Sequence, residues 1–243
     1  MPGRRIELSR RATRALCPVA KQQVGPSSSG PSPYPAGSPK CEKRILATRF
    51  VHRFLYRTGN LTMAIIRKPE PAALIIGMLS MQEGLFAPAE EKMQSLWGPI
   101  EFQSEIMPFA YTDYYTKEMG APLRRKFVSF AHYIDPGALA DIKHQSNALE
   151  DEIARSEAGR RLHVARCINL DPGYVESSKL VLATTKNYSH RIYIGKSMYA
   201  ESTLHYHKGA WQSWPFTYPD YASGDYDEFF TTVRNKLVNQ KKL

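Results

Sequence analysis

The sequence has little cysteine and no long apolar run, and each absence excludes a class of protein. Its three cysteines, Cys17, Cys41 and Cys167, show no CxxC spacing. This excludes a disulfide scaffold and a cysteine zinc site. The longest apolar run, residues 72–79, is far shorter than the roughly 20 residues that a transmembrane helix needs. We expect no membrane partner, and because no secretory signal is recognisable we expect a cytoplasmic protein.

The chain also lacks net charge once its first quarter is set aside. Residues 1–62 contain 12 Lys and Arg against 2 Asp and Glu, whereas residues 63–243 contain 21 of each kind. The whole net charge of +10 therefore lies before residue 63. A basic balance indicates nucleic acid or an anionic membrane surface as a partner. That indication applies here to the first segment alone, so we do not expect the folded domain to bind nucleic acid.

The basic segment does not have the composition of a folded domain. Residues 25–40 are a tract of Pro, Gly and Ser that cannot bury enough apolar surface to offset chain entropy. We predict a disordered leader over residues 1–62 and a single α+β domain over residues 63–243. Three interpretations of the leader stay open: an organellar transit peptide, a basic arm that touches nucleic acid, or a segment that is not translated because synthesis begins at Met63.

Hydrophobic patterns after Met63 predict alternating strands and helices. An unbroken apolar run indicates a central strand over residues 73–80, and the later patterns predict strands over 100–106, 126–134 and 164–170. One helix is expected from Pro88 to the Gly98-Pro99 stop, and a longer one after Asp135-Pro136. The order β-α-β-β-α-β predicts a ferredoxin-like core.

The C-terminal third adds elements to this core. We predict a short helix over residues 178–185, a β-hairpin of 191–194 and 199–207 about Gly195-Lys196, and a further strand over 211–218. Phe229, Val233 and Leu237 lie on one face of a closing helix. The predicted fold class is α+β: a ferredoxin-like core with an added C-terminal hairpin and a closing helix.

Four segments together carry a family resemblance. They are FAYTDYYTKEMG at 109–120, NLDPGY at 169–174, LATTKNYSHRIYIGK at 182–196 and YPDY at 218–221. The chain resembles a bacterial family of proteins of roughly 180 residues, the size of a single domain, that is catalogued as a domain of unknown function. Some members are labelled GTP-binding. The resemblance extends from Ala72 to about Val238 and implies no established activity, cofactor or catalytic residue.

The GTP label can be compared with the residues. A phosphate-binding P-loop has the pattern GxxxxGK[ST], in which the first glycine forms a tight turn. Gly195-Lys196-Ser197 supplies its second half, but His190 stands where the first glycine is required. The TKNY segment at 185–188 lacks the acid of a guanine-reading motif. A conventional GTPase is therefore disfavoured, nucleotide binding by another geometry stays open, and the cofactor is unknown.

Two segments concentrate acids and tyrosines. Proton transfer and anion contacts are available from a group between two predicted strands: Tyr111, Asp113, Tyr114, Tyr115, Lys117 and Glu118. The alternative is a structured turn in which the tyrosine rings pack. Asp171-Pro172-Gly173 is typical of a turn, and Asp171 would otherwise stand at a strand end, where sites of α/β type collect.

Two further segments carry the basic and histidine residues. Lys186, His190 and Arg191 suit a phosphate or carboxylate, although Arg191 would also face Glu201 across the hairpin as an ion pair. A period of two places Glu201, Thr203, His205 and His207 on one strand face. We expect a solvated face and no metal there, with Glu201, His205 and His207 as weak candidates for metal ligands.

Two main hypotheses follow. The first is a pocket for a phosphorylated or nucleotide-like small molecule. Its catalytic candidates are Asp113, Tyr115, Asp171 and His190. Its ligand-binding candidates are Lys117, Lys186, Arg191 and Lys196. It requires these polar residues to converge on one cavity. The second is a non-enzymatic interaction or structural module, in which they scatter and an apolar patch is exposed. A third, nucleic-acid binding through the leader, requires affinity that falls steeply with salt.

Overall fold

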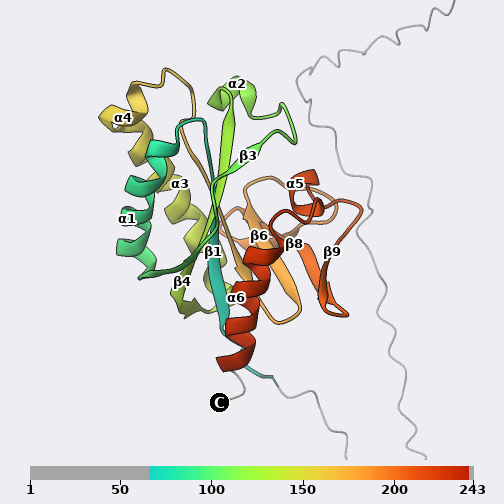
Figure 1. Cartoon of the computed structure of the whole chain (residues 1–243). Coiled ribbons are helices and arrows are strands. Elements are labelled where there is room, and N and C mark those ends of the chain that lie inside the picture. The colour runs from blue at the N-terminus through green and yellow to red at the C-terminus, as the bar shows by residue number, and fades with distance from the viewer. Residues whose placement is uncertain (1–65, 241–243) are drawn as a thin grey trace, which may run out of the picture. The chain divides into compact units, whose positions relative to one another are not determined.

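The computed structural model describes residues 66–240 (Figure 1). One sheet of nine strands organises this part of the chain, and all neighbouring strands in it are antiparallel. The fold is mixed α+β, and the leader predicted for residues 1–62 lies outside the described residues. The strand order is β2-β4-β1-β5-β6-β8-β7, with β3 paired to β4 and β9 paired to β8.

The strands are β1 (Ala72–Ser80), β2 (Ile100–Gln103), β3 (Met107–Phe109), β4 (Leu123–Ile134), β5 (Asn169–Val175), β6 (Lys179–Thr184), β7 (Ile192–Gly195), β8 (Met198–His207) and β9 (Ala210–Ser213). The α-helices are α1 (Phe86–Trp97), α2 (Thr116–Met119), α3 (Leu139–Arg155), α4 (Glu157–Arg160), α5 (Pro219–Ala222) and α6 (Asp227–Gln240). Two 3-10 turns, η1 (Glu83–Leu85) and η2 (Pro136–Ala138), precede α1 and α3.

Strand β1 is central and buried on both faces, which confirms the strand predicted from the unbroken apolar run. Leu74, Ile76 and Met78 pack in one core cluster with residues of α1 and α3. Ala73 and Ile75 point to the other face, where they pack in a second cluster with α6. Figure 1 shows α1 and α3 on one side of the sheet and α6 on the other. The sheet therefore forms the middle of three layers.

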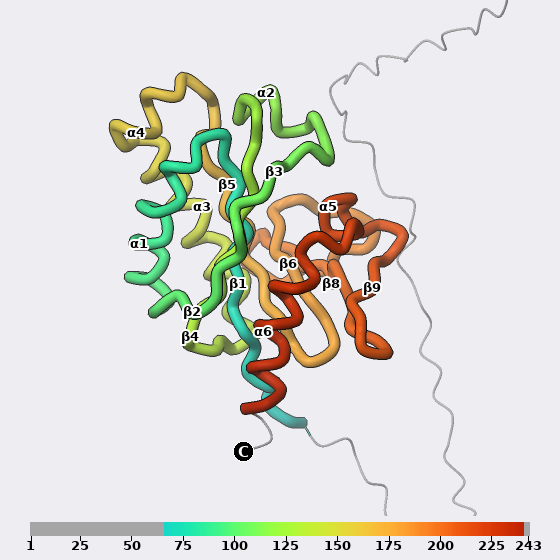
Figure 2. Tube along the Cα trace, viewed as in Figure 1, coloured from blue at the N-terminus to red at the C-terminus, as the bar shows by residue number. Residues whose placement is uncertain are grey.

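The residues that end one helix and begin the next were also identified correctly from the sequence. Helix α1 ends at Gly98, whose φ of 90° is open to glycine and rare for other residues. The Asp135 side chain accepts a hydrogen bond of 2.8 Å from the Gly137 amide and so begins η2, which leads into α3. The predicted closing helix is α6, whose C-terminal end lies near the beginning of β1 (Figure 2). Strands β7 and β8 form the predicted hairpin.

Two predictions about the middle of the chain were wrong. Residues 171–173 do not form a turn, because β5 begins only at Asn169 and runs through them to Val175. Asp171 pairs with Gly77 of β1, so pairing with the central strand overrides the local preference of Asp-Pro-Gly for a turn. Residues 178–185 contain strand β6 and no helix, since β5 and β8 pair with β6 on its two sides. A short apolar run does not distinguish these two states.

The strand predicted over residues 211–218 is shorter than expected. Strand β9 ends at Ser213, and the Thr217 amide then donates to the Trp214 carbonyl oxygen at 3.0 Å, which closes a turn. Pro215 occupies the second position of that turn, where its fixed φ is favourable.

The sheet divides between β5 and β6. Their pairing ends with Gly173 opposite Leu182, although the same register would next place Pro172 opposite Ala183. Pro172 has no backbone N–H to donate to a neighbouring strand. Strand β6 instead continues along β8 as far as Thr184, which pairs with Tyr199. The two strands thus separate on the N-terminal side of Gly173 in β5 and beyond Leu182 in β6, and we call this place the fork.

Gly173→Ala should destabilise the fold, because the added Cβ would lie 2.4 Å from the Val181 carbonyl oxygen and 2.6 Å from Leu182 Cδ2. We expect a loss of about 1–3 kcal/mol in the free energy of unfolding, measured by urea denaturation. Gly84→Ala is the matched control, since its Cβ would meet only Gln82 Nε2, at 3.4 Å. Equal stability of the two variants would show that β5 and β6 are not in close contact at Gly173.

Candidate functional site

A cavity of about 380 Å³ lies at the fork. Its lining comes from β3, β4, β5, β6, β8 and α3, together with parts of the segments 111–115 and 218–221. Elements on both faces of the sheet can reach it because β5 and β6 have separated there. A volume of this size falls in the range of small-molecule sites.

The buried charges of the domain are concentrated at this cavity. Five charged side chains in residues 66–240 belong to buried residues, and every one of them lines the cavity: Arg125, Lys143, Glu150, Glu201 and Asp220. The buried Asn169 lines it as well. Buried charge is unfavourable unless it is paired, so its confinement to one cavity marks a specialised region.

Arg125 of β4 crosses one side of the cavity. Its guanidinium Nη2 lies 3.3 Å from Asp220 Oδ2, and Nη1 lies 3.7 Å from Asp171 Oδ2. The guanidinium carbon also lies 4.9 Å from the Phe109 ring centroid, within the range of a cation–π contact. Gly77 of the neighbouring strand leaves room for it, because a Cβ there would lie 3.3 Å from Arg125 Nη1.

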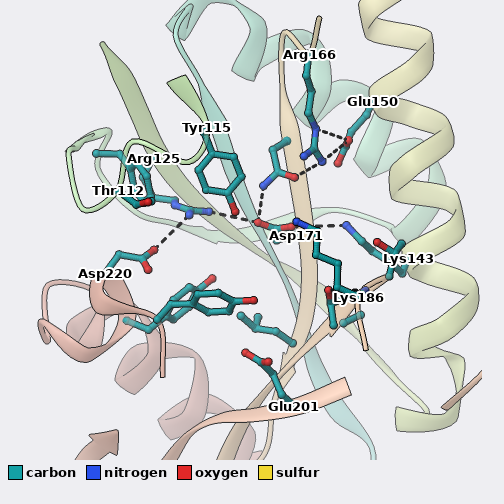
Figure 3. Close-up of a pocket in the computed structure, with 18 of the residues that line it drawn as sticks. Thr112, Tyr115, Arg125, Lys143, Glu150, Arg166, Asp171, Lys186, Glu201 and Asp220 are labelled. Carbon is teal, nitrogen blue, oxygen red and sulfur yellow. Dashed lines mark hydrogen bonds and ion pairs between the residues drawn. The ribbon is translucent and has the colours of Figure 1, made fainter. Parts of the chain in front are cut away.

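Asp171 of β5 lies at the centre of the charged network, and one quarter of its side chain is exposed. Arg125 and Lys143 approach its carboxylate from opposite sides (Figure 3). Lys143 Nζ lies 3.6 Å from Asp171 Oδ1 and donates to the Leu170 carbonyl oxygen at 3.0 Å. The Asn169 side-chain amide donates to the same carboxylate. This acid is therefore held in place while it faces the cavity.

A second ion pair continues the network along α3. Arg166 donates to Glu150 Oε2 from Nε at 3.1 Å and from Nη2 at 2.7 Å, and Nη2 also donates to Asn169 Oδ1. The other Glu150 oxygen accepts from the Leu170 amide at 2.7 Å. Through Asn169 this pair is connected to Asp171.

Burial shifts the protonation of several groups at the cavity. Desolvation raises the pKa of Glu150 and of Asp220, although Lys143 and Arg166 beside the first and Arg125 beside the second oppose the shift. Desolvation also raises the pKa of Tyr218 to about 12 and raises that of Tyr115. Both phenols are protonated at neutral pH and are available as hydrogen-bond donors.

The structure brings several of the candidate residues to the cavity. Tyr115, Asp171 and Lys186 line it directly. Arg191 and His190 lie behind the wall residue Glu201: Arg191 Nε donates to Glu201 Oε2 at 2.7 Å, and His190 Nε2 lies 3.0 Å from the same oxygen. The cross-strand ion pair expected between Arg191 and Glu201 is therefore present.

Three other candidates do not line the cavity. Asp113 and Lys117 are absent from its lining, although Thr112 and Tyr115 beside them contribute to it. Lys196 lies at the β7–β8 turn and forms an ion pair with Asp141 of α3, and its carbonyl oxygen accepts a hydrogen bond of 2.8 Å from His144 Nε2. The prediction that the polar residues converge therefore holds for only part of the set.

The common strand face predicted for Glu201, His205 and His207 does not exist. Strand β8 contains one extra residue, Thr203, between its pairs with two consecutive residues of β6. Such a bulge reverses the alternation of side chains, so Glu201 and His205 point to opposite faces. Within residues 66–240, no group of three or more His, Cys, Asp or Glu side chains is arranged to hold a metal ion. No helix in that same range is long and apolar enough to cross a membrane.

We call the charged residues that line the cavity its charged wall. The sequence patterns did not identify most of them: Arg125, Lys143, Glu150, Arg166 and Asp220. One signal was available. Lys143 and Glu150 are seven residues apart on α3 and adjoin its apolar stripe, so they share a side of the helix that turns toward the sheet. Arg125 gave a similar signal, because it stands between the apolar residues Leu123 and Phe127 on the same strand face.

Arg125→Met should strongly destabilise the domain, since it leaves Asp220 and Asp171 without their buried cation. We expect a loss of about 3–5 kcal/mol in the free energy of unfolding, measured by urea denaturation. Arg124→Met is the control, because the neighbouring Arg124 forms a surface ion pair with Glu83 and should lose less than about 1 kcal/mol. Similar losses in the two variants would contradict the buried network.

Asp220→Asn should cost more stability at pH 3 than at pH 7. The pKa of Asp220 is raised in the folded state, so the folded protein holds this proton more tightly than the unfolded chain does. The resulting contribution is complete below the unfolded value of about 3.9 and is lost as the pH rises through the folded pKa. Urea denaturation of both proteins across this range measures the difference, and a larger loss at pH 7 would contradict the assigned direction.

Comparison with known proteins gives one match. A family model described as a domain of unknown function (DUF4416) matches residues 70–237, which include every residue of the charged wall. No curated protein and no solved structure gives a significant match. Since the matched segment covers more than half of the sequence, the chain belongs to this domain-of-unknown-function family.

Proposed function

We propose that the domain binds a small phosphorylated or nucleotide-like molecule in the cavity at the fork. The observation that carries the proposal is the confinement of every buried charged residue among residues 66–240 to the lining of this one cavity. Replacing buried ion pairs by apolar side chains is often neutral or stabilising, so such pairs are weak devices for stability. Their collection around an open space supports a role in binding.

The wall acids already have partners within the protein. Asp220 lies beside Arg125, Glu150 beside Arg166, and Glu201 beside Arg191. These pairs neutralise the carboxylates, which would otherwise repel an anionic ligand. A phosphate that enters the cavity therefore meets three acids whose charge is compensated.

Lys186 is the cation at the mouth that favours an anion most directly. Among the described residues, Lys186 forms no ion pair with an acid. Its Nζ contacts the Tyr114 hydroxyl and lies 4.4 Å from the Tyr114 ring centroid. Its side chain is exposed. A phosphate or carboxylate can reach this ammonium group without displacing a protein carboxylate, and the protonated Tyr218 phenol adds a neutral donor.

The topology supports a finer description of one half of the fold. In the order β2-β4-β1-β5, helix α1 connects β1 to β2 and helix α3 connects β4 to β5. We infer that these elements form the ferredoxin-like core, to which β6, β8 and β7 are added beyond the fork. A site at the junction between core and addition resembles the switch points at which open sheets bind ligands.

The competing function, an interaction module, has support from one surface. Ile192 and Tyr193 of β7 are largely exposed, and β7 is the last strand in the sheet order. An exposed apolar edge strand is a template for pairing with another chain. This function predicts no small-molecule effect on stability, so a ligand screen separates the two.

The test is thermal unfolding of the full chain with adenine and guanine nucleotides, ribose 5-phosphate and inorganic phosphate. A ligand that binds the folded state alone, at 100 times its dissociation constant, adds about 2.7 kcal/mol and raises the melting temperature by several degrees. Lys186→Ala should weaken binding about tenfold or more, since it removes a charged donor.

Lys196→Ala is the matched control, because Lys196 is also an exposed lysine whose ammonium group contacts one residue, Asp141, but it lies away from the cavity. It should bind with the affinity of the wild type. The absence of any shift with these compounds, in a protein that melts cooperatively, would overturn the proposal in favour of the interaction module.

A further inference from the structure

Three aromatic side chains are exposed in one short segment that ends at the cavity. Trp214, Phe216 and Tyr218 are exposed to 39%, 42% and 39%. Tyr218 itself lines the cavity. We call residues 214–218 the aromatic turn. Exposed aromatic area grouped in this way is typical of binding surfaces.

The aromatic turn is held firmly in place. Thr217 Oγ1 accepts from the Trp214 amide at 2.8 Å and donates to the Thr203 carbonyl oxygen at 2.7 Å. The Thr217 amide closes the turn on the Trp214 carbonyl oxygen, and Pro215 limits the backbone further. A rigid surface of this kind loses little conformational entropy when a ligand stacks on it.

The ring planes of the turn are nearly parallel. The Trp214 and Phe216 rings are inclined by 11° with centroids 6.2 Å apart, and His190 stacks on Phe216 at 4.2 Å and 12°. Because His190 covers one side of Phe216 while almost half of this residue stays exposed, the turn presents aromatic surface to the solvent in one orientation. Such an arrangement suits a planar ring.

The turn is connected to the cavity wall by short steps. His190 lies 3.0 Å from Glu201, which lines the cavity, and the Arg191 guanidinium donates both to Glu201 and to the Tyr218 hydroxyl. The same guanidinium donates to the Lys186 carbonyl oxygen at 3.0 Å. The cation at the mouth and the aromatic turn are therefore attached to one side chain.

We propose that the aromatic turn is the subsite for a nucleobase, so that the ligand of the fork cavity is a nucleotide with its phosphate at Lys186 and its base on Trp214 and Phe216. This rests on the proposed function of the cavity. The division follows the chemistry of the two regions, since the cations lie in the cavity and at its mouth, whereas the exposed Trp214 and Phe216 rings do not line the cavity. Stacking on aromatic side chains adds affinity for any of the nucleobases, because every base has a π-face.

The experiment compares two probes that differ only by the base: a nucleoside 5′-monophosphate and ribose 5-phosphate, titrated calorimetrically into the full chain. Phe216→Ala should weaken the nucleotide about fivefold or more and leave ribose 5-phosphate unchanged. Phe216→Tyr keeps the ring and should retain the nucleotide affinity. Tyr193→Ala, at an exposed aromatic residue outside the turn, is the control for general surface effects.

The outcomes separate the two proposals. A nucleotide affinity that is unchanged in Phe216→Ala, or an equal loss for both probes, overturns the stacking subsite and leaves the cavity proposal standing. The same loss in Phe216→Tyr as in Phe216→Ala also overturns it. If neither probe binds the wild type, the cavity proposal fails and the subsite fails with it.

Discussion

The separation of the first part of β5, before Gly173, from β6 is the constraint on which the site depends. The backbone of Gly173 lies too close to Val181 and Leu182 for a side chain at this position. The two strands can pair closely here because the residue is glycine. Pro172 then supplies no amide for a further rung. Strand β6 keeps its pairing with β8, so it continues in register while β5 continues along β1. A continuous sheet would have placed backbone where the cavity now lies.

The opening explains why the charges are buried there and paired internally. Asp171 lies in the first part of β5, which pairs with β1 but not with β6. Its carboxylate can therefore be reached both by Arg125 of strand β4 and by Lys143 of helix α3, which covers one face of the sheet. Each isolated charge would be strongly unfavourable in this interior, and their mutual pairing reduces that penalty. The result is a polar interior that a packed apolar fold does not need for its stability.

The fold was predictable where a pattern is local. The apolar run identified the central strand over 73–80, Gly98 ended α1, and Phe229, Val233 and Leu237 identified α6. Asp171-Pro172-Gly173 misled because its turn preference is local, whereas its pairing with β1 joins residues almost a hundred positions apart. The site was less predictable for the same reason. Lys186 and Tyr115 were recognisable by residue type, but Arg125 packs closely against Gly77 of another strand, a contact that no local pattern indicates. The bulge at Thr203 likewise gave no local signal.

Arg191 shows how the separate parts of the site are coordinated. Its guanidinium joins the carbonyl of Lys186 at the end of β6, the carboxylate of Glu201 on β8, and the hydroxyl of Tyr218 before α5. A planar group with five donors can satisfy three acceptors in fixed directions, whereas a lysine ammonium is a point charge without such directions. The mouth, the wall and the aromatic turn therefore keep their relative positions through a side chain that does not itself line the cavity. In the proposed site Arg191 is thus a positioning residue, which acts through the fixed directions of its donors as well as through its charge.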